Sequence, residues 1–429
     1  MLNTQTSFNS QTKFLILTGC ILLMMSFGFR SSYGLFVKPI SEANLWGRDV
    51  ISMALAIQNL SWGIIAVFAG GLADKFGNVK VIVSAAIIYA GGLFLTTIAD
   101  SQWLLNTSTG FLVGAGIAGT SFGLVMPALA RAAPKEKRQW VLGVATAAGS
   151  FGQFTIVPFS QTLIDAFGWI NTLHVLSAMA LMMVFLAIPL APYSGSNEVK
   201  TDEQDQTIIE AICEAFRCHS YVLLTIGFFV CGFHLAFITV HFPGYLSDLG
   251  FDAKIAAWAI SIIGITNVIG SYSSGVLSGT QSKRSMLCSI YFLRAMTIAL
   301  FMTTPTSIAS VFIFSAVMGV LWLSTIPPTS GLIAVMFGTR YMALLYGIVF
   351  LSHQLGGFTG VYLGGYFYEQ SENYAIVSAF CGQYLGFESF GNASRYDIVW
   401  LISIALGIIA ALIHWPIKEM TIGRFARST

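Results

Sequence analysis

The chain has 429 residues, of which 55% are hydrophobic and only 9% are charged, a composition that excludes a soluble protein of ordinary type. Its formal net charge is only +2, so the positions of Lys and Arg along the chain are more informative than their total. We therefore interpret the chain as an all-α polytopic membrane protein.

Apolar stretches follow one another along the whole chain. A bilayer core of about 30 Å is crossed by about 20 helical residues. The sequence predicts twelve such spans, at residues 14–37, 50–72, 81–99, 103–127, 139–164, 171–192, 220–246, 255–278, 286–303, 307–330, 341–368 and 396–416. The first stretch has no cleavage-site pattern and is too long for a signal peptide, so we expect a retained helix.

Lys and Arg are unequally divided between the two sets of connections. The segments on the side of the N-terminus hold fifteen: Lys13, Lys75, Lys80, Arg131, Lys135, Lys137, Arg138, Lys200, Arg217, Lys283, Arg284, Arg340, Lys418, Arg424 and Arg427. The opposite segments hold four: Lys38, Arg48, Lys254 and Arg395. Because basic residues favour the cytoplasmic side, this asymmetry predicts that both termini are cytoplasmic.

Residues 193–219 form the one inner connection with linker character. They begin with the polar, acidic run YSGSNEVKTDEQDQ and continue with IIEAICEAF, whose residues Ile209, Ile212, Cys213 and Phe216 share one helical face. We predict a flexible tether followed by a short helix on the membrane surface. The linker divides the chain into two six-helix halves, residues 1–192 and 220–429.

The two halves resemble each other. The run GGLAD at residues 70–74 returns as GVLSG at residues 275–279, and Gly114 maps to Gly319 at the same offset of 205 positions. Gly143 and Gly152 map to Gly347 and Gly356 at an offset of 204. Parallel six-span halves are typical of alternating-access transporters, which bind substrate near the midplane between the halves.

The run GGLADKFGNVK after the second span resembles the signature loop of the major facilitator superfamily. Three further runs, RSSYGLFVKPI, CGFHLAFITVHFPGYLSDLG and SHQLGGFTGVYLGG, resemble bacterial members of its monocarboxylate and oxalate:formate transporter branch. The resemblance implies a cavity lined by spans 1, 4, 7 and 10, flanked by spans 2, 5, 8 and 11. It also implies a conformational latch in the signature loop, formed by Gly70, Asp74, Lys75 and Gly77.

Two departures from the family pattern bear on function. Span 8 of that branch commonly carries an arginine four residues after an Asp or Asn, whereas this chain has Asn267 followed by Ser271. Span 4 lacks the arginine of proton-driven exporters and reads LNTS at residues 105–108. The expected anion clamp is therefore missing, and a proton-driven drug exporter is disfavoured.

The ionisable side chains within the spans are Arg30, His234, His241, Arg294 and His353, whereas every Asp and Glu lies at a span end or in a loop. A charge within the membrane is costly and marks a polar cavity or a partner, and a cationic cavity attracts an anion. The alternatives are that Arg30 snorkels to the headgroups, that each histidine is a hydrogen-bonded structural residue, and that Arg294 is structural.

The candidate side chains follow from these observations. We expect the substrate to contact Arg30, His241, Asn267, Ser271, His353 and Gln153. Histidine titrates near neutral pH, so coupling to protons is expected from His353 first and His241 second. The anion could instead carry the proton itself.

Glycine and proline patterns predict how the spans pack. The series Gly356, Gly360 and Gly364, like the glycines of span 4, predicts close helix packing. Pro327 and Pro328 predict a break in span 10. The outer insertion at residues 369–395 is expected to form either an interfacial helix or a tolerated surface segment.

We therefore expect a monomeric secondary transporter of a small organic anion, most simply a monocarboxylate, in the cytoplasmic (inner) membrane of a bacterium. The alternatives are an exporter of amphipathic compounds and a transporter-derived ligand sensor. No enzymatic activity, cofactor or metal is expected, and the six cysteines form no CxxC pair that would indicate a zinc site. The expected partners are the substrate, protons and the lipid bilayer, without nucleic acid.

Overall fold

The computed structural model describes residues 10–134, 137–193, 207–338, 341–388 and 391–421. The regular elements in these ranges are all helical. The N-terminal half contains α1 (Ser10–Asn44), α2 (Arg48–Phe76), α3 (Asn78–Thr97), α4 (Gln102–Leu105), a π-helical segment (Asn106–Leu112), α5 (Val113–Thr120), α6 (Phe122–Ala132) and α7 (Arg138–Ala187).

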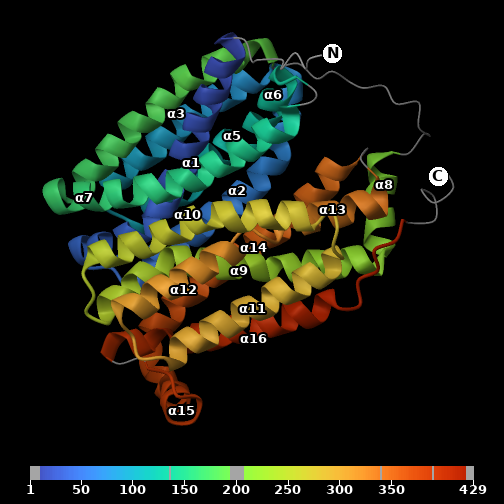
Figure 1. The fold of residues 1–429 in the computed structure, drawn as a ribbon. Helices are drawn as coiled ribbons and strands as arrows, with labels where there is room; N and C mark the ends of the chain where they lie inside the picture. Colours follow the sequence, from blue (N-terminus) through green and yellow to red (C-terminus); the bar gives the residue numbers. More distant parts are fainter. Residues whose placement is uncertain (1–9, 135–136, 194–206, 339–340, 389–390, 422–429) are drawn as a thin grey trace.

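The linker contributes α8 (Ile208–Arg217). The C-terminal half contains α9 (His219–Asp248), α10 (Ala253–Leu277), α11 (Lys283–Thr303), α12 (Ile308–Leu321), α13 (Ile326–Phe337), α14 (Met342–Glu369), α15 (Ala375–Leu385) and α16 (Asp397–His414). In Figure 1 the N-terminal half, blue to green, lies above the C-terminal half, yellow to red.

Eleven helical segments in the described ranges are long and apolar enough to cross a membrane. One of them, Trp140–Ala191, has 52 residues, more than twice the length that a bilayer core requires. Its helix α7 is interrupted at Gly168, whose φ of +77° lies in the region that favours glycine. The two legs of α7 are the predicted fifth and sixth spans, so the prediction of twelve spans is confirmed.

The internal repeat is visible in how the halves pack. A side chain at Gly114 would come within 2.5 Å of the Gln58 carbonyl, and one at Gly319 within 2.7 Å of the Ile263 carbonyl. Gln58 and Ile263 are 205 positions apart, as are the two glycines. Each half therefore brings its fourth span against its second span at the same register.

A second equivalent contact joins the fifth span of each half to its first. Gly152 of α7 lies against the backbone of Met24 in α1, and Gly356 of α14 lies against the backbone of Phe229 in α9. Met24 and Phe229 are also 205 positions apart. Small residues at these positions permit the backbones to approach closely, as the glycine series predicted.

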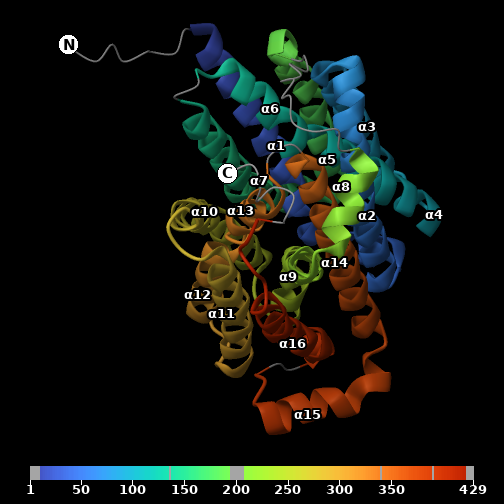
Figure 2. The same cartoon turned by 90° about the vertical axis from the view of Figure 1, so that its right-hand side faces the viewer.

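The two ends of the bundle differ. We call the end with the starts of α1 and α9 the linker end; there the amide of Lys418 donates to the Ser220 hydroxyl at 3.0 Å. The opposite end, which carries Arg48, Asp248 and α15, we call the insertion end. Figure 2 shows α15 at the bottom of the view, below α14 and α16 and away from the start of α1.

Span 10 is broken, as predicted, but the prolines are not in the gap. Helix α12 ends at Leu321 and α13 begins at Ile326, so Pro327 and Pro328 lie in the first turn of α13. Proline is tolerated there because the first helical N–H groups have no partner within the helix. The gap between the two helices leaves backbone carbonyls that other groups must satisfy.

The predicted surface helices both expose apolar side chains. In α8 the side chains of Ile209 and Phe216 are exposed, and in α15 those of Ile376, Phe380 and Tyr384. Nothing in the structure tests whether either helix lies on a membrane, so both interpretations stay predictions.

Candidate functional site

Helix α1 has a stripe of accessible side chains that stops abruptly. Ile21, Met24, Phe27 and Arg30 are each half-buried, whereas every residue from 31 to 37 is buried. Ile21, Met24, Phe27 and Arg30 follow one another at a spacing of three residues, so they are neighbours on the helix surface. Because α1 is surrounded by α2, α5, α6, α7, α9 and α10, this stripe faces other helices. Arg30 is therefore the last accessible residue on a face of α1 that begins at the linker end.

Helix α9, the equivalent helix of the other half, has the same asymmetry. Near the linker end Val222, Ile226 and Phe229 are half-buried or exposed, whereas every residue from Val230 to Leu246 is buried. Both central helices are thus accessible towards the linker end and enclosed towards the insertion end.

The guanidinium of Arg30 contacts two residues of α2. It donates to the Asn59 side-chain oxygen at 3.2 Å and lies 4.8 Å from the centre of the Trp62 ring. The Asn59 amide in turn donates to the Leu55 carbonyl at 2.9 Å, which fixes its orientation. The ion pairs Lys38–Glu42 and Arg48–Asp248 do not involve Arg30, and no carboxylate among the described residues forms an ion pair with it. Arg30 therefore keeps several N–H donors and a positive charge available for an anion.

Aromatic rings from both halves pack around Trp62, the ring that lies beside this guanidinium. Phe27 stacks on Phe122 with ring centres 4.4 Å apart and meets Trp62 edge-on at 6.0 Å. Trp62 also meets Phe350 of α14 edge-on at 5.3 Å. The site therefore combines one cation with apolar, aromatic walls.

The same row of rings leads to His353. The Phe350 ring stacks on the His353 ring with centres 5.6 Å apart and planes inclined by 11°. His353 also lies 3.2 Å from the Gln354 side-chain oxygen through Nδ1. Of the predicted site residues, the structure thus links Arg30 and His353 through Trp62 and Phe350.

A family model described as the Major Facilitator Superfamily matches residues 19–361. The chain belongs to the major facilitator superfamily. It is 24% identical over 370 residues to the uncharacterized MFS-type transporter YcxA of Bacillus subtilis (strain 168), with 83% of this chain and 88% of that protein covered. It is 26% identical over 370 residues to monocarboxylate transporter 13 of Rattus norvegicus, with 84% and 83% covered.

A solved structure supports the same fold. A bacterial homologue of the human lysosomal transporter Spinster, in an inward-facing and unoccupied conformation, superposes with a TM-score of 0.74. The match covers 95% of this chain and 97% of that one at 14% identity, which shows a shared fold alone. The resemblance of the signature loop to this superfamily is therefore confirmed.

In this major facilitator protein, His241 lies away from Arg30. Its Nε2–H donates to the Val361 carbonyl at 2.8 Å, and its ring packs 5.5 Å from the Tyr396 ring. His234 is likewise directed to a backbone carbonyl, that of Ser403, at 2.8 Å. Both histidines belong to the enclosed stretch of α9, so the structure does not bring them to the accessible face.

The amides predicted to bind substrate form hydrogen bonds between the two halves, and their contact with substrate stays a prediction. Asn267 of α10 donates to the Ser150 hydroxyl of α7 at 2.8 Å and accepts from the Leu323 amide at 3.0 Å. Its oxygen also accepts from the Ser271 hydroxyl at 3.0 Å. Gln153 of α7 donates to the Ile260 carbonyl of α10 at 2.9 Å. These groups already have protein partners in this conformation.

The signature-loop residues lie at the linker end of α2. Gly70 has open space around it, and the exposed Lys75 ammonium lies 5.3 Å from the Phe76 ring. Gly77 joins α2 to α3 with φ of +89°, a conformation that favours glycine. The side chain of Asp74 lies outside the described part of the protein, so its predicted role as a latch stays a prediction.

The sequence did not single out Arg48, which forms an ion pair across the insertion end. Its guanidinium donates to both Asp248 carboxylate oxygens, at 2.6 and 2.8 Å, and to the Tyr396 hydroxyl at 3.0 Å. Its backbone amide donates to the Glu369 carboxylate at 2.6 Å. The only hint in the sequence was that opposite charges occur at span ends on the same side.

Arg294 donates hydrogen bonds to backbone carbonyls at the break in span 10. Its guanidinium, fully buried, donates to the Leu321 carbonyl at 2.7 Å and also to the Trp322 carbonyl, at the end of α12. These are the carbonyls that the gap in span 10 leaves without helical partners. The contact favours the structural interpretation of Arg294.

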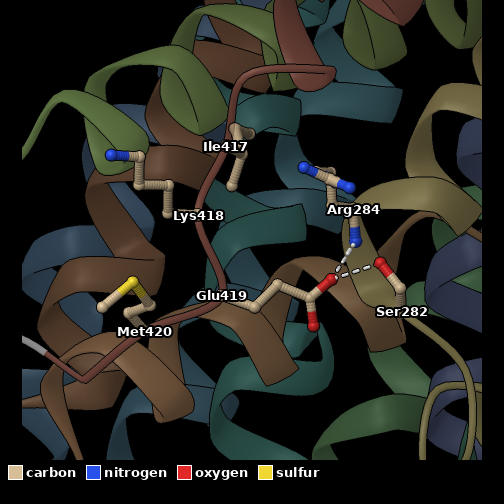
Figure 3. A pocket seen from close by; sticks show the side chains of 6 residues that line it. All are labelled: Ser282, Arg284, Ile417, Lys418, Glu419 and Met420. Carbon is tan, nitrogen blue, oxygen red and sulfur yellow. Dashed lines mark hydrogen bonds between the residues drawn. The ribbon is translucent and has the colours of Figure 1, made fainter.

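A surface pocket of about 330 Å³ lies at the linker end, between the start of α11 and the segment after α16 (Figure 3). The Glu419 carboxylate accepts from the Ser282 hydroxyl at 2.6 Å and from the Arg284 amide at 2.8 Å. Partial burial disfavours the charged carboxylate, but these hydrogen bonds and the charge of Lys283 hold the pKa of Glu419 below its ordinary value. The Ser282 hydroxyl and the Arg284 amide of this pocket are therefore occupied by the protein itself.

Within the described ranges, no group of three or more His, Cys, Asp or Glu side chains is arranged to hold a metal ion. The candidate site residues that the structure brings together are Arg30 and His353, through the rings of Trp62 and Phe350.

Proposed function

We propose that this transporter moves a small organic anion, a monocarboxylate, across a bacterial cytoplasmic membrane by alternating access, with Arg30 binding the carboxylate. The observation that best supports this proposal is that Arg30 is the last accessible residue on this face of α1 and has guanidinium N–H groups left to donate. Carboxylate binding by a guanidinium is strong because two parallel N–H···O bonds combine with opposite charge. Such a site disfavours the alternative of an exporter that binds apolar cations.

Two further observations support a carboxylate. Named relatives include monocarboxylate transporter 13, over most of both chains. The aromatic walls around Arg30 offer little to a strongly hydrated ion but suit an organic body.

The conformation supports alternating access. Arg48 and Asp248 close the insertion end, while the stripe on α1 is accessible from the linker end. If the linker end is cytoplasmic, as the distribution of Lys and Arg predicts, this state is inward-facing. The inward-facing structure of the Spinster homologue has the same fold.

Uptake of radiolabelled carboxylates into proteoliposomes tests the proposal. Arg30→Gln should abolish carboxylate uptake, whereas Lys13→Gln, which removes an exposed charge from the same helix, should transport as the wild type does. Size-exclusion profiles would establish that both variants are folded. Unchanged uptake and affinity in Arg30→Gln would contradict the proposal, and uptake of apolar cations alone would favour the exporter.

A further inference from the structure

The charges near Arg30 limit the substrate to one negative charge. The other arginine in the middle of a described span, Arg294, is fully buried and bonded to backbone carbonyls. With His353 neutral, a second carboxylate on the substrate would therefore lose its water without gaining a cation, which costs several kcal/mol. A substrate with one negative charge therefore matches the single cation at this site, and a dicarboxylate does not.

Trp62 has a polar group without a partner. Its side chain is only 6% exposed, and its indole N–H has no hydrogen-bond partner among the described residues. A buried donor left unpaired is costly, so a group that bonds to it would be stabilised there. The guanidinium of Arg30 lies over the same ring, 4.8 Å from its centre. The Arg30 guanidinium therefore lies beside the ring that carries this unpaired donor.

The rings beside this donor form apolar walls. Phe27 and Phe350 both meet the Trp62 ring edge-on, and Phe122 continues the wall from α6. Phe27, Phe122 and Phe350 are each half-buried, so part of every ring remains accessible. Aromatic pairs gain from edge-to-face and offset-stacked contacts beyond the area they bury.

We propose that Trp62, with Phe27 and Phe350, selects monocarboxylates that carry a flat aromatic ring: the indole N–H and Arg30 hold the carboxylate, and the three rings hold the substrate ring. This inference rests on the proposed function and narrows its substrate class. Small hydroxy acids bind less tightly, because they have no ring for the aromatic walls, and Asn59 already uses its oxygen on Arg30 and one N–H on the Leu55 carbonyl.

The test measures dissociation constants by calorimetry on the full chain in nanodiscs, with matched probes. Benzoate and cyclohexanecarboxylate have the same carbon skeleton but differ in ring flatness. Benzoate should bind about tenfold more tightly, a ratio typical of one or two aromatic contacts. Terephthalate, which adds a second charge, should bind at least about a hundredfold more weakly than benzoate.

Variants separate the two roles of Trp62. Trp62→Phe keeps a ring but loses the N–H, so both probes should bind about tenfold more weakly with their ratio retained. Trp62→Leu should also lower the ratio by about threefold or more. Trp103→Phe, at an indole that is 80% exposed, is the matched control and should change neither value. Phe350→Leu should lower the ratio as well, and it keeps the test decisive if Trp62→Leu does not fold.

Two results would overturn the inference. Equal affinity for benzoate and cyclohexanecarboxylate in the wild type, with lactate binding that depends on Arg30, removes aromatic selection but leaves carboxylate transport intact. If the ratio of the benzoate and cyclohexanecarboxylate affinities is unchanged in both Trp62→Leu and Phe350→Leu, other residues select the aromatic ring. If no carboxylate binds, the proposed function fails as well.

Discussion

Arg48 and Asp248 form a two-fold hydrogen-bonded ion pair that joins the start of α2 to the end of α9, 200 positions apart in the chain. Their side chains are only 9% and 5% exposed. The Arg48 guanidinium also lies 4.2 Å from the centre of the Tyr368 ring. Because α2 and α9 belong to opposite halves, the pair must separate whenever the insertion end opens.

We predict that Arg48→Gln shifts the protein towards a state open at the insertion end. Removing one partner of a buried ion pair costs about 3–5 kcal/mol, since the other charge is left uncompensated. A penalty of about 3 kcal/mol on the closed state changes the population ratio by about a hundredfold. Spin labels at the exposed positions Trp103 and Ile376, in a background without the six native cysteines, would report longer distances.

Two controls accompany this experiment. Lys254→Gln removes an exposed charge at the same end and should leave the distances unchanged. The double variant Arg48→Asp, Asp248→Arg should restore the short distances, at least in part. An unaltered distance distribution in Arg48→Gln would mean that other contacts hold this end closed.

The fold was predictable because a bilayer imposes a length on every span. Hydropathy therefore located the helices, and glycine spacing revealed the repeat, since Gly114 and Gly319 must both admit a neighbouring backbone. Arg30 was also predictable, because a charge inside a span is costly and is rarely retained without a role.

The contacts that close and line the site were not predictable. Arg48 and Asp248 lie at span ends, where charges are ordinary, so only the packing of the halves reveals their pairing. The sequence around Asn267 does not reveal whether its side chain binds substrate or Ser150. The rings around Arg30 could not be distinguished among 34 phenylalanines and 9 tryptophans in apolar spans.

Arg294→Met should lower thermal stability without changing substrate affinity. The substitution keeps much of the buried volume but leaves the Leu321 and Trp322 carbonyls without donors, at a cost of about 1–3 kcal/mol each. The melting temperature in detergent and the KM for carboxylate uptake at a permissive temperature are the two readouts. A raised KM with unchanged melting temperature would instead assign Arg294 to substrate binding.

Glu419 should stabilise the linker end in a pH-dependent way. Because its pKa is lowered in the folded protein, its stabilisation is present above the ordinary carboxyl value of 4.5 and is lost as pH falls through the lowered folded value. The melting temperature of Glu419→Gln should be below that of the wild type at pH 7, with the gap closing as the pH falls below 4.5 and through the lowered folded value. Glu372→Gln, at an exposed residue, should show no such gap; a gap that is independent of pH would refute the ionic explanation.

Coupling to protons is the last prediction, and the structure separates the two histidines proposed for it. His353 is connected to Arg30 through stacked and edge-on rings, Phe350 and Trp62, so a positive charge on it would act near a bound carboxylate. His241 is enclosed at the insertion end with its Nε2–H committed to the Val361 carbonyl. We therefore expect His353→Gln to retain exchange of substrate for substrate but to lose accumulation driven by an imposed pH gradient.

The control is His241→Gln, which should keep gradient-driven accumulation and lose thermal stability, because the Val361 carbonyl and the packing against Tyr396 are disturbed. Both variants are compared in the same proteoliposomes, first with equal pH and labelled substrate outside, then with an acidic exterior. Exchange without a gradient reports binding and conformational change alone, whereas accumulation also requires a proton to move with the substrate. If the double variant still concentrates substrate as the wild type does, neither histidine carries the proton, and the protonated acid itself, or exchange with a second anion, becomes the driving step.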